Sequence, residues 1–150
     1  MMAKPSGFKQ AKHKAGSRNR KPGRSFSGKK ELTLWDQASR WYDSLVGGQG
    51  TDFQKDIIMP GVFRLLEVRK KDRVLDLACG QGVFSRYLAR KGIHVEGLDS
   101  SSELVKYARA RSGPSIRYHV GDAGDAESFE AARFDGIACL MAIQNIEKMD

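Results

Sequence analysis

The chain has little cysteine and no long apolar segment. Two of its 150 residues are cysteines, Cys79 and Cys139. Two thiols can form neither a disulfide framework nor a cysteine-based zinc site, so we expect both to be buried in a reducing compartment. No run of about 18 apolar residues occurs, and no apolar stretch follows the basic N-terminus. We therefore expect a cytoplasmic chain with no membrane span and no secretory signal.

Acidic residues are absent from positions 1–30, which contain ten lysines and arginines. Residues 31–150 hold 16 basic and 18 acidic side chains, so the formal net charge of +8 comes from the N-terminal segment. That segment is rich in Gly and Ser and cannot bury enough apolar surface to offset its ordering entropy. We predict a disordered basic tail at 1–30. It would bind RNA or another polyanion by counterion release, or serve only as a solubilising extension.

Two helices are predicted between residues 31 and 70. Apolar residues recur at helical spacing from Leu34 to Leu45 and stop at Gly47-Gly48. Thr51 and Gln54 have the spacing of a capping box and introduce a second apolar helix. We expect Pro60-Gly61 to break or kink that helix. The aromatic residues of the first helix are expected to be core or lid residues: Trp35, Trp41 and Tyr42.

From residue 73 onward, short apolar runs alternate with helical patterns. The predicted strands are 73–78, 93–98, 115–120 and 134–140, with an acidic turn or helix between the last two. A helix is predicted at 83–90, and another begins at a capping box of Ser100 and Glu103. Such repeats imply right-handed crossovers in an α/β fold, a Rossmann-like doubly wound parallel sheet. We therefore predict one domain over 31–150 after the basic tail.

A glycine-containing loop joins the first of these strands to its helix. Gly80 and Gly82 let a ligand approach the backbone, and the following helix start offers free N–H groups. Asp99 closes the second strand, where a carboxylate can accept hydrogen bonds from both ribose hydroxyls of an adenosine. A nicotinamide dinucleotide fits this pattern too. Against it, Ser85 replaces the third glycine of the dinucleotide motif, and Asp76 would repel a pyrophosphate but attract a cationic ligand.

Four segments in order resemble the class I S-adenosylmethionine-dependent methyltransferases. Val74–Phe84 is similar to the family's glycine-rich first motif, and Val95–Asp99 to its second. Gly121–Ala123 resembles the third motif, and Phe134–Leu140 the fourth strand. The resemblance implies that Asp76 orients the ammonium of S-adenosylmethionine, Asp99 holds the ribose and Asp122 meets the adenine. The cofactor-binding residues it implies are Asp76, Ala78, Cys79, Gly80, Gly82, Asp99, Ser100, Asp122, Ala123 and Leu140.

Each of these acids also has a purely structural interpretation. Asp76 could brace the glycine loop, Asp99 could cap the next helix, and Asp122 could be a solvated turn residue. His94 and His119 have no metal-ligand spacing, so we expect packing or surface roles for them and no metal site.

The chain departs from the family pattern in four ways. Ala78 stands where glycine is common, and Gln144-Asn145 stand where small-molecule methyltransferases often have two histidines. No Asn-Pro-Pro-Tyr motif follows the fourth strand, which disfavours exocyclic amines of nucleic acid bases. The family fold has seven strands, so we expect the sequence to be a fragment.

The resemblance implies methyl transfer to a small-molecule acceptor, with no catalytic base identified. Three alternatives remain open: an RNA methyltransferase docked by the basic tail, a nicotinamide-dependent oxidoreductase, and a fragment without activity of its own.

Overall fold

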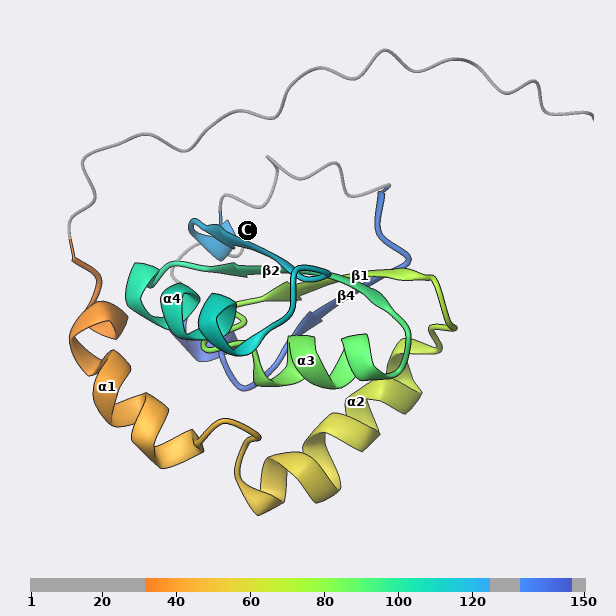
Figure 1. The fold of residues 1–150 in the computed structure, drawn as a ribbon, viewed down its shortest axis with the longest axis horizontal. Coiled ribbons are helices and arrows are strands. Elements are labelled where there is room, and N and C mark those ends of the chain that lie inside the picture. The colour runs from red at the N-terminus through yellow and green to blue at the C-terminus, as the bar shows by residue number, and fades with distance from the viewer. Residues whose placement is uncertain (1–31, 125–132, 147–150) are drawn as a thin grey trace, which may run out of the picture.

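The computed structural model contains a four-stranded parallel sheet (Figure 1). It describes residues 32–124 and 133–146. The predicted basic tail and most of the predicted acidic turn lie outside these ranges. The spatial order of the strands is β3-β2-β1-β4, and all three pairings are parallel. This confirms the predicted Rossmann-like sheet. The strands are β1 (Arg73–Leu77), β2 (His94–Asp99), β3 (Arg117–Val120) and β4 (Gly136–Cys139).

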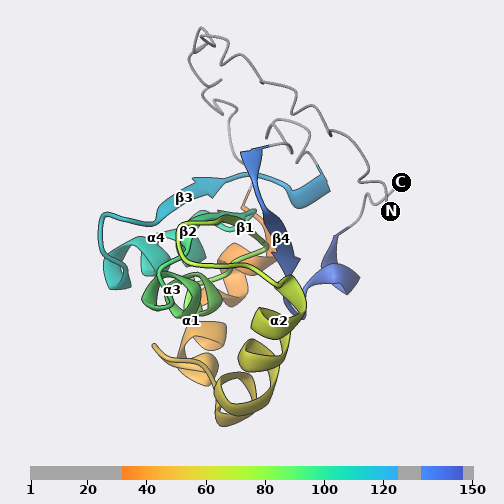
Figure 2. The ribbon, with the colours of Figure 1, turned by 90° about the vertical axis from the view of Figure 1, so that its right-hand side faces the viewer.

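Four α-helices of the described ranges lie on one face of this sheet (Figures 1 and 2). Val74 of β1 and Val95 of β2 are opposite each other in the register and point into the core beneath the helices. Leu88 and Val105 meet them there, each 0% exposed. The helices are α1 (Leu34–Val46), α2 (Met59–Leu66), α3 (Val83–Arg90) and α4 (Ser102–Arg111), with a π-helical turn η1 (Gln54–Ile58) before α2 and a 3-10 turn η4 (Ile143–Asn145) after β4.

Strand ends differ from the prediction by one or two residues. The first strand ends at Leu77 because Ala78 has a left-handed backbone, with φ of 52°. The second extends through Asp99, whose position pairs with Val120 of β3. Asp99 is therefore the last paired residue of its strand, at the same sheet edge as the glycine loop.

Pro60-Gly61 does not break the second helix, so the expectation of a break is wrong. Helical structure continues through both residues to Leu66, and the irregular turn lies just upstream in η1. There the Met59 N–H donates to the Gln54 carbonyl, five residues back. Pro60 lies in the first turn of α2, where its missing N–H costs little, and a wider turn before it accommodates the ring.

Helix caps are partly as predicted. The Thr51–Gln54 box is confirmed: the Gln54 N–H donates to Thr51 Oγ1 at 3.2 Å, and the Thr51 N–H donates to Gln54 Oε1 at 2.9 Å. The prediction of Ser100 as the cap of α4 is wrong by one residue. Ser101 is the N-cap, and its Oγ accepts the Leu104 N–H at 3.2 Å.

Candidate functional site

The candidate site lies at the carboxyl ends of the parallel strands. There the loop between β1 and α3 meets the ends of β2 and β4 and the inner side of α1. Three residues of the loop have positive φ: Ala78 (52°), Gly80 (54°) and Gly82 (78°). Left-handed backbone is costly for a residue with a Cβ, so Ala78 is held in a conformation that favours glycine. The loop thus adopts a left-handed backbone at an alanine as well as at its two glycines.

Two neighbouring cavities open beside this loop. The larger has a volume of about 110 Å³ and the smaller about 40 Å³. Four residues line both cavities: Tyr42, Ala78, Leu140 and Met141. The two cavities are therefore adjacent parts of one site. Nine of the ten predicted residues line it. Asp76 and Cys79 line the smaller cavity, Ala78 and Leu140 line both, and the larger is lined by Gly80, Asp99, Ser100, Asp122 and Ala123.

Gly82 is the predicted residue that lines neither cavity. A Cβ at this position would collide with the Tyr118 hydroxyl and lie 3.1 Å from the Ala108 Cβ. Gly82 is also the N-cap of α3, with a left-handed backbone. Its structural role is therefore close packing of α3 against β3 and α4.

Asp99 is fixed in orientation by two backbone donors. The Gly80 N–H donates to Asp99 Oδ2 at 2.7 Å, and the Ser101 N–H donates to Asp99 Oδ1 at 2.8 Å. The side chain is buried, with 7% exposed, yet it lines the larger cavity. Asp99 thus links the glycine loop to the start of α4 and presents a pre-oriented acceptor to the cavity.

Asp76 is a buried carboxyl group in the smaller cavity wall. It is 1% exposed, and the Ser85 hydroxyl donates to its Oδ2 at 2.5 Å. Burial raises the pKa of Asp76 to about 7, and the charge of Asp99 adds to this effect. Ser85 stands where the dinucleotide motif has its third glycine, and here it donates a hydrogen bond to Asp76.

Two residues of the site, Cys79 and Tyr42, and the nearby Cys139 are held in their neutral forms. Burial raises the pKa of Cys79 well above its usual value, and the charges of Asp76 and Asp99 add to this. Burial also raises the pKa of Tyr42, again with a contribution from Asp99. Cys139 is partly buried, and burial raises its pKa as well. None of these groups is an activated nucleophile.

Helix α1 contributes site residues that the sequence could not assign. Trp35 and Tyr42 line the larger cavity, with their rings edge to face at 5.6 Å between centroids. Trp41 is 63% exposed, so the expectation of a core role is wrong for it. Helical spacing places Trp35 and Tyr42, seven residues apart, on one face, but only the position of α1 shows that this face meets the cavity.

Of the remaining polar candidates, the two histidines and Gln144 line neither cavity, whereas Asn145 lines one. His94 is exposed, and His119 contacts Glu96 at 2.9 Å between Nε2 and Oε2, as expected for packing or surface roles. Asn145 lines the larger cavity, whereas the exposed Gln144 does not. Within the described residues, no three His, Cys, Asp or Glu side chains gather in a metal-binding arrangement. The same part of the chain has no helix that is long and apolar enough to span a membrane.

Residues 74–150 match the family model described as Methyltransferase domain. A ubiquinone biosynthesis O-methyltransferase of Xylella fastidiosa (strain 9a5c) is 39% identical over 77 residues, which cover 49% of this chain and 31% of that protein. The protein of the same description from Xanthomonas axonopodis pv. citri (strain 306) is 30% identical over 115 residues, covering 73% of this chain and 46% of that protein. The chain thus spans less than half of the length of these curated relatives.

Solved methyltransferase structures share the fold. One is a SAM-dependent methyltransferase from Thiobacillus denitrificans in complex with S-adenosyl-L-homocysteine. Its TM-score is 0.56 at 23% identity, covering 75% of this chain and 45% of that one. Another is phosphoethanolamine N-methyltransferase 2 of Haemonchus contortus in complex with S-adenosyl-L-methionine, with a TM-score of 0.56 at 24% identity, covering 69% and 25%. The family model covers over half of the sequence, and the structure has the fold of these methyltransferases. The chain therefore belongs to the methyltransferase domain family, among the class I S-adenosylmethionine-dependent methyltransferases.

Proposed function

We propose that the chain binds S-adenosylmethionine across the two joined cavities and directs its methyl group to a nucleophile on a small molecule. The observation that carries this proposal is the charge of the cavity walls. Asp76, Asp99 and Asp122 line them, and no lysine, arginine or histidine of the described residues does. Such walls repel the pyrophosphate of a nicotinamide dinucleotide and attract the ammonium and sulfonium of S-adenosylmethionine.

The residues divide the ligand between the cavities. In the larger cavity, Asp99 would hold the ribose, because carboxylate oxygens accept several hydrogen bonds and this carboxylate is already oriented. Asp122 and Ala123 would meet the adenine there. In the smaller cavity, Asp76 would face the ammonium group. The wall of this cavity also contains the apolar residues Ile58, Met59, Phe84 and Met141.

S-adenosylmethionine supplies an already activated methyl group on its sulfonium. The task of the chain is therefore orientation and exclusion of water. Tyr42 is suited to this task because its ring lies where the two cavities join. No histidine base lines either cavity among the described residues.

For the acceptor, the curated relatives provide the supporting observation. The two relatives described above are both named as ubiquinone biosynthesis O-methyltransferases. We accordingly propose an oxygen nucleophile on a small molecule for this chain.

Calorimetric titration of the chain with S-adenosylhomocysteine tests the cofactor assignment. We expect binding by the wild type and a Kd about tenfold or more higher in Asp99→Asn, which loses the charge but keeps the shape. Asp56→Asn is the matched control, because Asp56 is exposed on η1 and lines neither cavity. A melting temperature raised by NADH but not by S-adenosylmethionine would overturn the assignment.

An RNA acceptor is a second candidate, favoured by the ten basic and no acidic residues of the proposed tail at 1–30. Such binding predicts an affinity for RNA that falls steeply with salt and disappears when residues 1–30 are removed. RNA binding that is unchanged by the deletion would count against this docking role.

A further inference from the structure

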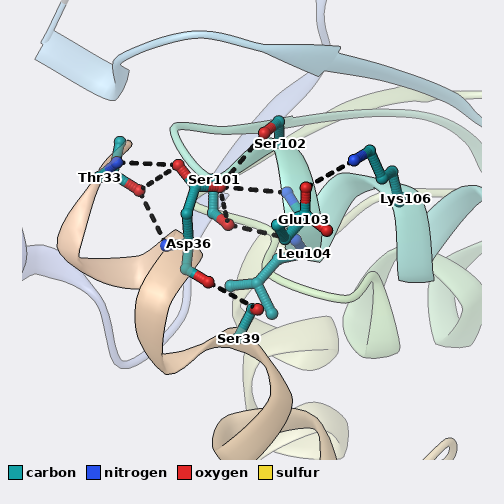
Figure 3. A network of polar contacts seen from close by, with 8 residues as sticks. All are labelled: Thr33, Asp36, Ser39, Ser101, Ser102, Glu103, Leu104 and Lys106. Atoms are coloured by element: carbon teal, nitrogen blue, oxygen red, sulfur yellow. Dashed lines mark hydrogen bonds and ion pairs between the residues drawn. The ribbon is translucent and has the colours of Figure 1, made fainter. Parts of the chain in front are cut away.

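One carboxylate joins the start of helix α1 to the start of helix α4. Asp36 Oδ2 accepts the Thr33 N–H at 2.8 Å and the Thr33 hydroxyl at 3.0 Å. Its Oδ1 accepts the Ser101 hydroxyl at 2.8 Å, the Glu103 N–H at 3.1 Å and the Ser102 hydroxyl at 3.3 Å. Figure 3 shows these five donors converging on Asp36 from both helices. We call Thr33, Asp36, Ser101, Ser102 and Glu103 the Asp36 network.

The carboxylate of this network is strongly held in its ionised form. Burial alone would raise the pKa of Asp36, but hydrogen bonds from Thr33, Ser101 and Glu103 outweigh it and hold the pKa well below its usual range. The positive end of the α4 dipole also favours an anion at this point. Asp36 is therefore charged throughout the physiological pH range.

The network continues into the cofactor site through Ser101. The hydroxyl of Ser101 donates to Asp36, while its backbone N–H donates to Asp99 Oδ1. Ser101 is 0% exposed, so water does not replace either contact readily. Two successive hydrogen bonds thus connect Asp36 to the carboxylate proposed to hold the ribose.

Asp36 also fastens the wall of the larger cavity. Trp35, its neighbour on α1, lines that cavity, and Tyr42 lines it about two turns further along the same face of the helix. The far end of α1 has separate anchors, because the Gln81 side chain donates to the Gly47 carbonyl at 3.0 Å and Arg86 donates to the Gly48 carbonyl at 2.8 Å. Loss of Asp36 would release the end of α1 that carries Trp35, and leave the other end attached to the glycine loop.

We propose that Asp36 is a positioning residue of the cofactor site, which orients Asp99 through Ser101 and holds Trp35 of α1 against the larger cavity. This inference rests on the proposed function, because it takes that cavity as the adenosine site. Asp36 itself lines neither cavity and acts through these other groups.

The test uses the whole chain and three variants. Asp36→Ala removes the carboxylate. Asp36→Asn keeps one acceptor oxygen, but its amide cannot serve α4 and Thr33 equally well. Thr33→Val is the matched control, because it removes the cap hydroxyl of α1 and leaves the Asp36 contacts to α4. Its expected cost is about 1 kcal/mol of stability.

The first measurement is amide hydrogen exchange in the ligand-free chain. We expect exchange at Ser101 and in the first turn of α1 to accelerate about tenfold or more in Asp36→Ala, because hydrogen bonds to a charged group are lost. Asp36→Asn should give a smaller acceleration, and Thr33→Val should leave Ser101 unchanged. The proposal would be overturned if the Ser101 amide exchanged at the wild-type rate in both Asp36 variants. If Asp36→Ala does not fold, a wild-type rate in Asp36→Asn alone would overturn it.

The second measurement is the Kd of S-adenosylhomocysteine at a temperature well below unfolding. The Kd should rise about fivefold or more in Asp36→Ala and stay near the wild-type value in Thr33→Val. A purely structural role predicts equal Kd values in all folded variants, and that result would overturn the inference. A wild-type chain that binds no S-adenosylhomocysteine would instead overturn the proposed function, while the exchange data would still decide whether Asp36 orders this loop.

Discussion

The substitution Asp76→Asn tests the electrostatics of the site most directly. In the folded chain, burial raises the pKa of Asp76 from 3.8 to about 7. At about 1.4 kcal/mol for each pKa unit, the ionised form costs roughly 4 kcal/mol of folding free energy above pH 7. That is a large share of the total for a domain with ordinary stability. Asparagine has nearly the same shape but no charge. Without ligand, Asp76→Asn should therefore be more stable than the wild type at pH 8.

The sign of the pH dependence follows from the raised pKa. Between pH 3.8 and about 7 the folded state holds a proton on Asp76 that the unfolded state has lost. Wild-type stability therefore decreases as the pH rises through this range and then levels off. The stability advantage of Asp76→Asn should grow by about 1.4 kcal/mol per pH unit and become constant near pH 7.

Urea unfolding from pH 5 to pH 9 measures this advantage. Asp122→Asn is the matched control, because Asp122 is an exposed acid that lines the neighbouring larger cavity. An advantage that is equally large at pH 5 and pH 8 would refute the reasoning, since a gain unrelated to ionisation does not follow the titration.

The same group links pH to ligand affinity. An ammonium beside Asp76 requires the ionised carboxylate. The wild-type Kd for S-adenosylhomocysteine should therefore rise as the pH falls, to about tenfold at pH 6 relative to its value above pH 8. In Asp76→Asn the affinity should be weaker and nearly independent of pH over this range. Titration in buffers with different ionisation enthalpies should show proton release on binding to the wild type at pH 6, and an absence of release would contradict this role.

Three further predictions concern packing and buried charge. Gly97→Ala should destabilise by about 1–3 kcal/mol in urea unfolding, because its Cβ would lie 2.7 Å from the Tyr118 ring and 2.9 Å from Cys79 Sγ. Arg86→Met should lower the free energy of unfolding, measured with urea, by about 2 kcal/mol, because the carbonyls of Gly48 and Gln81 lose their guanidinium donor. The hydrogen bond from His119 and the charge of Arg133 lower the pKa of Glu96 below 4.5. The wild type should therefore be more stable than Glu96→Gln by a constant amount above pH 4.5, and this difference should decrease at lower pH. A flat difference between pH 3 and pH 7 would contradict the last prediction.

Much of the site could be predicted because its signals are local. The strand–loop–helix segment around Gly80 and the acid at the end of the second strand each depend on neighbours in the sequence. Parallel pairing then brings these segments to one edge, since the carboxyl ends of parallel strands meet there. Nine of the ten predicted residues consequently line the two cavities.

The sequence-based predictions fail where contacts between residues far apart in the sequence determine the role of a residue. The role of Gly82 depends on Tyr118 and Ala108, which come from other elements. Trp35 and Trp41 lie on different faces of α1, since they are six residues apart. Which of the two faces meets the cavity depends on where α1 packs, and only Trp35 lines the cavity.

The sequence by itself determined the parallel α/β sheet, the glycine loop and the two carboxylates, because hydrophobic period and residue spacing encode local structure. Only the tertiary structure decided how those carboxylates are held. Ser85 supports Asp76 across nine residues, and Asp36 reaches Ser101 across 65. Hydrogen bonds over such separations depend on how helices pack on the sheet, which no local pattern specifies. The raised pKa of Asp76 has the same origin, since it comes from burial.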